Sequence, residues 1–175
     1  MFTDPVKNLK AFGIKEDMLV ADLGAGTGFY TIVAAEMAPK GKVYAIEIQK
    51  DFLDTIQNKA KEQKLENIHC LWGDVEKKCG TKIKDKIIDR VIASNILFQV
   101  ENKDKFIEEA KRILKKEGKL LFIDWSIDST FKANELKALS KDKAKNLFEI
   151  KGFKLDREID TGVHHYGMIF SIAGE

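Results

Sequence analysis

The hydrophobic positions along the chain fall into short apolar runs separated by longer amphipathic segments. The apolar runs predict seven strands, at residues 18–23, 42–47, 67–72, 87–93, 118–124, 153–159 and 165–172. The segments between them predict helices at residues 5–12, 29–38, 50–63, 102–115 and 141–151. Alternation of strands and helices is typical of a parallel sheet covered on both faces, so we expect a doubly wound α/β fold.

The last two predicted strands are connected differently from the others. Asp160, Thr161 and Gly162 alone separate Ile159 from the apolar run that begins at Val163. A parallel crossover needs about a dozen residues or more, so this connection must be a hairpin. The pattern therefore predicts six strands of one sense and one reversed strand at the C-terminal end. Earlier in the chain, Gly41, Gly118 and Gly152 follow helical stretches and are expected to cap them in the left-handed conformation.

A glycine-rich turn follows the first predicted strand and precedes the first long helix. Gly24, Gly26 and Gly28 stand at alternate positions, and Asp22 lies two residues before them. A strand, a glycine turn and a helix form a nucleotide-binding corner. A dinucleotide would bring a pyrophosphate there, which suits a helix N-terminus but not a nearby carboxylate. The spacing also departs from the dinucleotide pattern G-x-G-x-x-G, because Phe29 follows Gly28. S-adenosylmethionine carries an ammonium and a sulfonium instead of phosphate, so the pattern favours a methyl-donor site.

A second acidic residue, Glu47, ends the next predicted strand about 20 residues after the glycines. In a doubly wound sheet this position lies beside the ribose of the bound nucleoside. We therefore expect the Glu47 carboxylate to accept hydrogen bonds from the ribose hydroxyls.

Composition and charge narrow the class of protein. The chain has 175 residues, which predicts one domain over residues 1–175, and 30 basic residues nearly balance 28 acidic ones. The lysines, densest between Lys77 and Lys86, are expected to form a solvated face and not a nucleic-acid groove. Two cysteines without metal-ligand spacing predict no metal site. With neither a signal peptide nor a membrane span in the pattern, we expect a cytoplasmic protein.

Over nearly its whole length the chain resembles the class I S-adenosylmethionine-dependent methyltransferases, closest to the ubiquinone- and menaquinone-biosynthesis (type 11-like) group. The segments that carry the resemblance are 20–28, 73–75, 88–95, 112–121 and 164–170. The resemblance implies a Rossmann-like sheet of strand order 3-2-1-4-5-7-6 with strand 7 reversed. It also implies a donor site with an ammonium-binding end, a ribose-binding end and an adenine-binding end. The donor-site residues we expect are Asp22, Gly24, Ala25, Gly26, Gly28, Phe29, Tyr30, Thr31, Glu47, Ile48, Gly73, Asp74, Val75, Ser94 and Asn95.

The catalytic residues are harder to identify from the sequence. Relatives often place a histidine just after the fourth strand, but this chain has Phe98 and Gln99 there. The remaining candidates for a base are His164 and His165, which the hairpin brings to the same rim as the glycine turn. Since neighbouring side chains on a strand point to opposite faces, one histidine can face the site, and we expect it to be His165. Asn95, at the carboxyl end of the fourth strand, is expected to orient the substrate or the donor.

The acceptor of the methyl group is not defined by any motif. A loop at about 125–140 and the aromatic residues Phe29, Tyr30, Phe98, Trp125 and Phe131 could cover and line an acceptor site, which slightly favours a small molecule. The alternatives are an RNA or protein methyltransferase, a donor-binding subunit without catalysis of its own, and a nicotinamide-dependent oxidoreductase, which Asp22 and Phe29 disfavour. The sequence does not predict an oligomeric state.

Overall fold

The computed structural model describes residues 3–126 and 138–174 of the chain, as seven strands and five helices that alternate except at two places where one strand follows another directly. The strands are β1 (Leu19–Leu23), β2 (Lys42–Glu47), β3 (Ile68–Trp72), β4 (Ile88–Ser94), β5 (Leu114–Trp125), β6 (Phe153–Ile159) and β7 (His165–Ile172). The helices are α1 (Pro5–Phe12), α2 (Phe29–Met37), α3 (Lys50–Glu62), α4 (Lys103–Ile113) and α5 (Lys141–Ile150).

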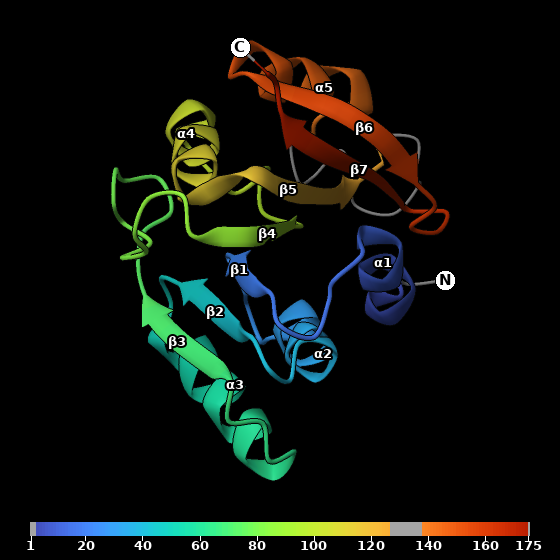
Figure 1. Ribbon diagram of the computed structural model, residues 1–175. Helices are drawn as coiled ribbons and strands as arrows, with labels where there is room; N and C mark the ends of the chain where they lie inside the picture. The colour runs from blue at the N-terminus through green and yellow to red at the C-terminus, as the bar shows by residue number, and fades with distance from the viewer. Residues whose placement is uncertain (1–2, 127–137, 175) are drawn as a thin grey trace.

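The strands form one mixed sheet in the order β3-β2-β1-β4-β5-β7-β6, which Figure 1 shows from β3 at the bottom to β6 at the top. Strands β1 to β5 are parallel, and β7 pairs antiparallel with both β5 and β6. The expected strand order, with its single reversed strand, is confirmed. The chain reverses direction across the sheet between β1 and β4, where ligands bind at the carboxyl ends of open α/β sheets.

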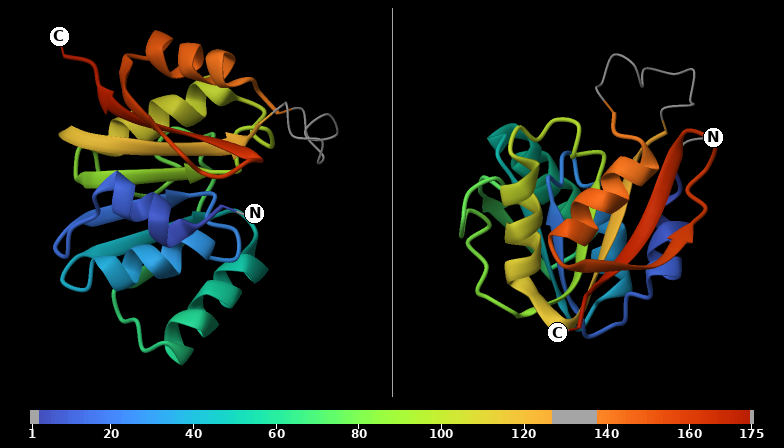
Figure 2. Two further views of the ribbon diagram at one scale, coloured as in Figure 1. Left: turned by 90° about the vertical axis from the view of Figure 1, so that its right-hand side faces the viewer. Right: turned by 90° about the horizontal axis from the view of Figure 1, so that it is seen from above.

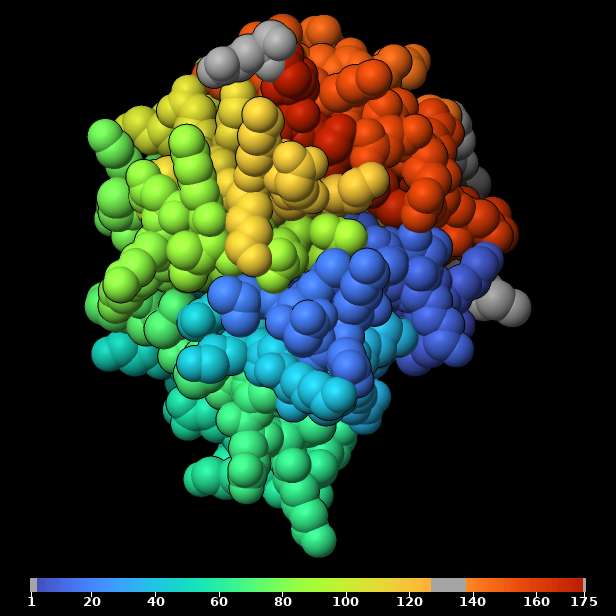
Figure 3. Space-filling model, viewed as in Figure 1, coloured from blue at the N-terminus to red at the C-terminus, as the bar shows by residue number. Residues whose placement is uncertain are grey.

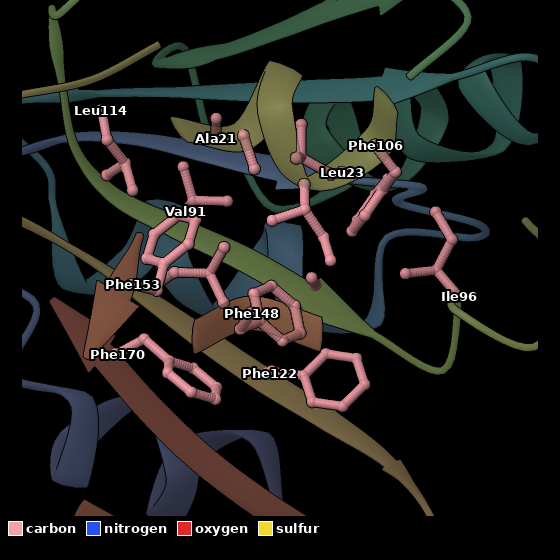
Figure 4. Close-up of a cluster of buried hydrophobic side chains, with 14 of the residues drawn as sticks. Ala21, Leu23, Val91, Ile96, Phe106, Leu114, Phe122, Phe148, Phe153 and Phe170 are labelled. Carbon is pink, nitrogen blue, oxygen red and sulfur yellow. The ribbon is translucent and has the colours of Figure 1, made fainter. Parts of the chain in front are cut away.

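Alternating side chains of the central strands supply two separate cores. Val20, Ile92 and Ile123 point to one face, where they pack with Leu9 of α1 and Ala34 of α2. On the opposite face, Val91, Leu120 and Phe122 pack with buried residues of α4 and α5. Figure 2 shows the ribbon of these two helices beside β5 in two further views. The aromatic centre of this second core appears in Figure 4, where Phe122, Phe148, Phe153 and Phe170 gather together.

Side-chain caps fix where three helices begin. Asp4 accepts a hydrogen bond from the backbone N–H of Lys7, Asn102 from that of Lys105, and Ser140 from that of Lys143. Each cap satisfies one of the backbone donors that a helix N-terminus leaves free.

The passage from α4 to β5 differs from the expectation. The predicted helix 102–115 ends at Ile113, and the strand predicted to start at 118 begins at Leu114, which is fully buried and pairs with Ile88. Burial of Leu114 against β4 overrides the helical pattern, so Gly118 lies inside a strand and not at a helix end. A Cβ at Gly118 would lie 3.0 Å from the carbonyl oxygen of Ile88, so close backbone approach requires glycine there.

Of the other two glycines that we expected to cap helices, Gly152 does so and Gly41 does not. Gly152 has φ +82° and ends α5 as predicted. Gly41 has no positive φ, and a Cβ there would lie 2.0 Å from the Met18 carbonyl oxygen. The expectation for Gly41 was therefore wrong, because the residue allows two backbone segments to meet.

Helix α1 is fastened to the C-terminal hairpin, and Figure 3 shows the dark blue N-terminal segment in contact with the red hairpin. The Lys7 ammonium lies 2.6 Å from the Asp160 carboxylate, and Arg157 donates to the carbonyl oxygen of Ala11. Most of the predicted loop 125–140, with Phe131, lies outside the described residues. Within the described part of the chain, no helix has the length and apolar character needed to cross a membrane.

Candidate functional site

A pocket of about 380 Å³ opens at the carboxyl ends of β1, β2, β3 and β4. Apart from Gly28 and Thr31, every residue that we expected in the donor site lines it, namely Asp22, Gly24, Ala25, Gly26, Phe29, Tyr30, Glu47, Ile48, Gly73, Asp74, Val75, Ser94 and Asn95. Segments far apart in the sequence therefore meet at one place.

Asp22 lies at the end of β1 with its side chain almost fully buried. Its carboxylate accepts a hydrogen bond of 2.6 Å from the Thr31 hydroxyl, which explains why Thr31 stands behind the pocket wall and not in it. The pKa of Asp22 is raised to about 6, mainly by burial and to a smaller extent by the charge of Glu47, while the hydrogen bonds from Thr31 lower it. A buried carboxylate beside a second acid favours a bound cation.

The three glycines of the turn serve different purposes. All have positive φ, but a Cβ at Gly24 would lie 2.1 Å from Ile96 Cδ1, and one at Gly28 would lie 2.9 Å from Ile56 Cγ1. Nothing lies within 4 Å of the Cβ position at Gly26. The sequence predicted bare backbone open to a ligand, and that description fits Gly26. Gly24 and Gly28 also make room for packed side chains.

Glu47 is held by backbone donors from two segments. Its Oε2 accepts from the Gly26 N–H at 2.9 Å, and its Oε1 accepts from the N–H groups of Ile48 and Gln49 at 2.8 and 3.0 Å. These bonds fix the carboxylate between the glycine turn and the end of β2. A carboxylate can accept about four hydrogen bonds, so capacity remains for a hydroxyl donor.

Asp74 lies in the loop after β3 and lines the pocket together with Ile48. Its Oδ1 accepts from the backbone N–H of Glu76 at 3.0 Å, and its Oδ2 lies 3.1 Å from the Lys77 ammonium. The Glu76 bond, aided by Lys77, lowers the pKa of Asp74, which keeps the group an acceptor at neutral pH. Ile48 and Val75 add apolar surface to the lining, so the pocket offers both an acceptor and apolar walls for a planar ring with an amino group.

Ser94 and Asn95 mark the carboxyl end of β4. Asn95 has φ +52°, a conformation that asparagine tolerates better than most residues, and its backbone N–H donates to the Ile123 carbonyl at 2.8 Å. Within the described part of the chain, the side-chain oxygen of Asn95 is buried without a hydrogen-bond partner. This oxygen has the capacity to bind a donor group of a ligand.

The hydrogen bonds that support Tyr30 could not be predicted from the sequence. Its hydroxyl lies 2.9 Å from the Asn8 side-chain nitrogen and 3.2 Å from the Thr3 hydroxyl, and all three residues are buried. Burial raises the pKa of Tyr30, so the hydroxyl stays protonated at neutral pH. Because Tyr30 lines the pocket, the N-terminal segment is connected directly to the pocket wall.

His165 does not line the pocket. The residue is buried at the start of β7, and its ring stacks on Trp125 with the ring centres 4.2 Å apart. Trp125 and His165 are register partners, two and four residues from Ile123 and Ile169, which belong to the core under α1. Alternation therefore places His165 on the same face of the sheet as Tyr30. Burial lowers its pKa to about 4, so the imidazole is neutral at pH 7. Its catalytic role stays a prediction.

Charge in the pocket has a single sign. Asp22, Glu47, Asp74 and Glu76 line it, and no lysine, arginine or histidine does so among the described residues. Glu76 was not predicted as a lining residue, and neither were Thr27, Ile46, Gln49, Phe52, Ile96, Gln99 and Val100. Most of them lie just beyond strand ends, although Ile46 belongs to β2 and Phe52 to α3, and no residue type distinguished them.

The adenosyl donor fits these residues. The pocket has the volume of a mononucleoside ligand, an open glycine backbone, and carboxylates in place of the cations that a pyrophosphate would need. No group of three or more histidine, cysteine, aspartate or glutamate side chains is placed to hold a metal ion within residues 3–126 and 138–174.

Comparison with known proteins agrees with this geometry. Residues 14–171 match the model of a family described as a methyltransferase domain. The chain is 30% identical to a SAM-dependent methyltransferase from Aquifex aeolicus, whose crystal structure superposes with a TM-score of 0.89 over 98% of this chain and 91% of that one.

Two curated relatives carry more specific names. A fibrillarin-like rRNA/tRNA 2′-O-methyltransferase from Methanocaldococcus jannaschii is 31% identical over 89% of this chain and 65% of its own length. A demethylmenaquinone methyltransferase from a Geobacillus strain is 26% identical over 67% of this chain and 50% of its own length. Across four curated relatives, these two among them, the match covers between 44% and 67% of the relative's own length.

Proposed function

Because the chain belongs to the class I S-adenosylmethionine-dependent methyltransferases, we propose that it transfers a methyl group from S-adenosylmethionine to an acceptor. We propose further that residues 1–175 form one domain and that the protein works in the cytoplasm. The expected relationship to the menaquinone-type group is in line with one of the curated relatives.

The observation that carries this proposal is the sign of the charges in the pocket. Four carboxylates line the pocket, and the described lining contains no basic side chain. The donor brings an ammonium and a sulfonium, which such a pocket stabilises, whereas the pyrophosphate of a nicotinamide dinucleotide would be repelled. The oxidoreductase alternative is disfavoured for the same reason.

The donor would be held at three places. Asp22 and the backbone near Gly24 would bind the ammonium, Glu47 the ribose hydroxyls, and Asp74 the amino group of adenine, with Ile48 and Val75 against the ring. The remaining residues of the expected set, among them Gly73 and Ser94, complete the walls of the pocket. The bound donor supplies a methyl group that is already activated by its sulfonium leaving group.

The chain itself has to align the acceptor and exclude water. Asn95 is suited to orient a donor group of the acceptor or of the methionyl end, because its side-chain oxygen is free of other partners in the described structure. We keep His165 as the candidate that receives a proton. Its low pKa of about 4 makes the neutral imidazole available over the whole physiological range, but makes it a weak base.

A small molecule remains our proposal for the acceptor. Tyr30, at the pocket wall, is backed by Thr3 and Asn8, so the N-terminal segment covers one side of the pocket and favours an enclosed acceptor. RNA is the second candidate, because one relative is named as an RNA methyltransferase and the loop before β4 carries the exposed side chains of Lys78, Lys84 and Lys86. A donor-binding subunit that needs a partner for catalysis is the third.

Transfer of a labelled methyl group into a cell extract tests the proposal. The protein is incubated with methyl-labelled S-adenosylmethionine and the extract, which is then separated into metabolites, protein and RNA. Label in the metabolite fraction is the expected result. Label in the RNA fraction would identify RNA, and not a small molecule, as the acceptor. Tight donor binding with no label in any fraction would instead support the non-catalytic subunit. The matched control is the Asp22→Asn variant, which should label nothing.

A further inference from the structure

Trp72, the last residue of β3, contacts the wall of the donor pocket without lining it. Its indole Nε1–H donates to the carbonyl oxygen of Ile48 at 2.8 Å. The ring is 51% exposed, and the ammonium groups of Lys50 and Lys82 lie 5.0 and 5.3 Å from its centre. These cation–π contacts, from α3 and from the loop before β4, hold the ring in its orientation.

Residues 47–49, which we call the ribose turn, depend on polar contacts for their position. The backbone N–H of Gly73 donates to the Glu47 carbonyl at 3.1 Å, and the N–H of Ile48 donates to the Glu47 carboxylate. The Ile48 carbonyl receives the Trp72 bond. The backbone of Ile48 is therefore held at two points: its N–H by the Glu47 carboxylate and its carbonyl oxygen by the Trp72 indole.

Packing cannot replace this indole contact. Ile48 is 57% exposed, whereas Ile46, two residues earlier, is fully buried. An exposed side chain on a turn has few neighbours to hold it in place. The position of Ile48 in the pocket wall therefore depends on the hydrogen bonds of its backbone.

We propose that Trp72 is a positioning residue for the donor: its indole N–H preorganises the ribose turn, so that Glu47 and Ile48 meet the adenosine half of the ligand in their binding geometry. This inference rests on the proposed donor site. Preorganisation lowers the ordering cost of binding, so its loss weakens every ligand that carries the adenosine group.

The Trp72→Phe variant tests the inference, because it keeps an aromatic ring and removes the N–H. Binding of S-adenosylhomocysteine and of 5′-methylthioadenosine, which lacks the amino-acid half, is measured by calorimetry. Both affinities should fall by the same factor, about threefold to fivefold, the effect of one neutral hydrogen bond. The matched control is Tyr166→Phe, which also removes a ring donor bonded to a backbone carbonyl, that of Leu139 at 3.1 Å, but lies outside the pocket lining and should leave both affinities unaltered.

Fluorescence provides a second readout that leaves Trp72 in place. In the Trp125→Phe protein Trp72 is the single tryptophan, and because the ribose turn is already in its binding geometry, S-adenosylhomocysteine should leave its emission maximum nearly unchanged. Unchanged affinities in Trp72→Phe, a loss confined to S-adenosylhomocysteine, or a large shift of the emission maximum on binding would overturn the proposal. If the wild-type protein binds neither ligand, the proposed donor site itself is wrong.

Discussion

At the scale of single residues, Asp22 is the group on which donor recognition depends in the proposed site. The carboxylate is buried, bonded to Thr31 and close enough to Glu47 for their charges to interact. In the ligand-free protein these surroundings penalise the charged form. A bound ammonium removes that penalty, so binding and ionisation of Asp22 are linked.

Donor affinity should therefore depend on pH. With a pKa of about 6 in the free protein, Asp22 is ionised at pH 7 and mostly protonated at pH 5, where it no longer attracts the ammonium. The affinity for S-adenosylhomocysteine should fall about tenfold between pH 7 and pH 5, as measured by calorimetry. In Asp22→Asn the affinity should be low at both values, and an equally steep pH dependence in that variant would contradict the assignment.

The glycine turn gives a second prediction at this scale. Gly26→Ala adds a methyl group where the structure is open, at a cost of about 1 kcal/mol for the positive φ, and should mainly weaken donor binding. Gly24→Ala forces the methyl group against Ile96 and should mainly lower stability. Thermal unfolding and calorimetry on the two variants separate the effects. If Gly26→Ala binds as tightly as the wild type, the ligand does not approach that backbone.

The sequence could predict that Asp22, Gly26 and Glu47 line the pocket, because the proposed chemistry needs acids and a glycine at these strand ends. Asn8 and Trp72 could not be predicted. Their roles come from hydrogen bonds to Tyr30, 22 positions away, and to Ile48, 24 positions away, and these depend on the folded arrangement and not on local pattern.

At the scale of elements, α4 is joined to the loop between β3 and β4 by a buried acid. Glu109 accepts hydrogen bonds from the backbone N–H groups of Cys79 and Thr81, the Thr81 hydroxyl and the Arg112 guanidinium. Arg112 in turn pairs with Asp85. Because the same loop carries Asp74, this network holds the proposed adenine-binding end of the pocket against α4.

The network should make stability sensitive to acid. Burial alone would raise the pKa of Glu109, but the bonds from Arg112 and Thr81 outweigh it and hold the pKa at about 2, below the ordinary 4.5. Its contribution to the free energy of unfolding is then complete above about pH 4.5 and is lost as the pH falls towards 2.

Glu109→Ala should lower the free energy of unfolding by about 3 kcal/mol at pH 7, since it leaves Arg112 and two loop N–H groups without this partner. Urea unfolding at pH 7 and at pH 3 checks this, and the loss should be smaller at pH 3. A loss of equal size at both values would show that packing, and not the charged hydrogen bonds, is responsible.

Element types followed well from periodicity, and six of the seven predicted strands agree with the structure within a residue at each end. The exception is β5, which begins at Leu114. The segment 114–117 continues an amphipathic helical pattern in sequence, and its pairing with β4 is a long-range contact that no local signal records.

At the scale of the whole molecule, the two ends of the chain close one side of the sheet together. Helix α1 is tied to the hairpin by Lys7–Asp160 and Arg157–Ala11, and to the pocket wall by Asn8 and Tyr30. The strand order could be predicted once the resemblance was stated, because the fold repeats a known topology. The position of α1 could not, since amphipathicity does not say which surface a helix covers.

These ties are not equal in strength. Asn8→Ala removes two buried hydrogen bonds and should lower the free energy of unfolding by about 2 kcal/mol. Lys7→Met breaks an ion pair whose side chains are both more than half exposed, so its effect should be much smaller. Urea unfolding of the two variants compares them. The reverse ranking would mean that surface charge, and not the buried contacts, fastens α1.

The central claim is that an acidic pocket at the carboxyl edge of the sheet binds a cationic adenosyl donor and rejects a phosphate-bearing dinucleotide. Titration calorimetry of the full chain with S-adenosylmethionine and with NAD at pH 7.5, in wild type and Asp22→Asn, tests it most directly. We predict tight binding of S-adenosylmethionine, no binding of NAD, and loss of donor binding in the variant. Comparable affinity for NAD, or donor affinity unchanged by Asp22→Asn, would contradict the account.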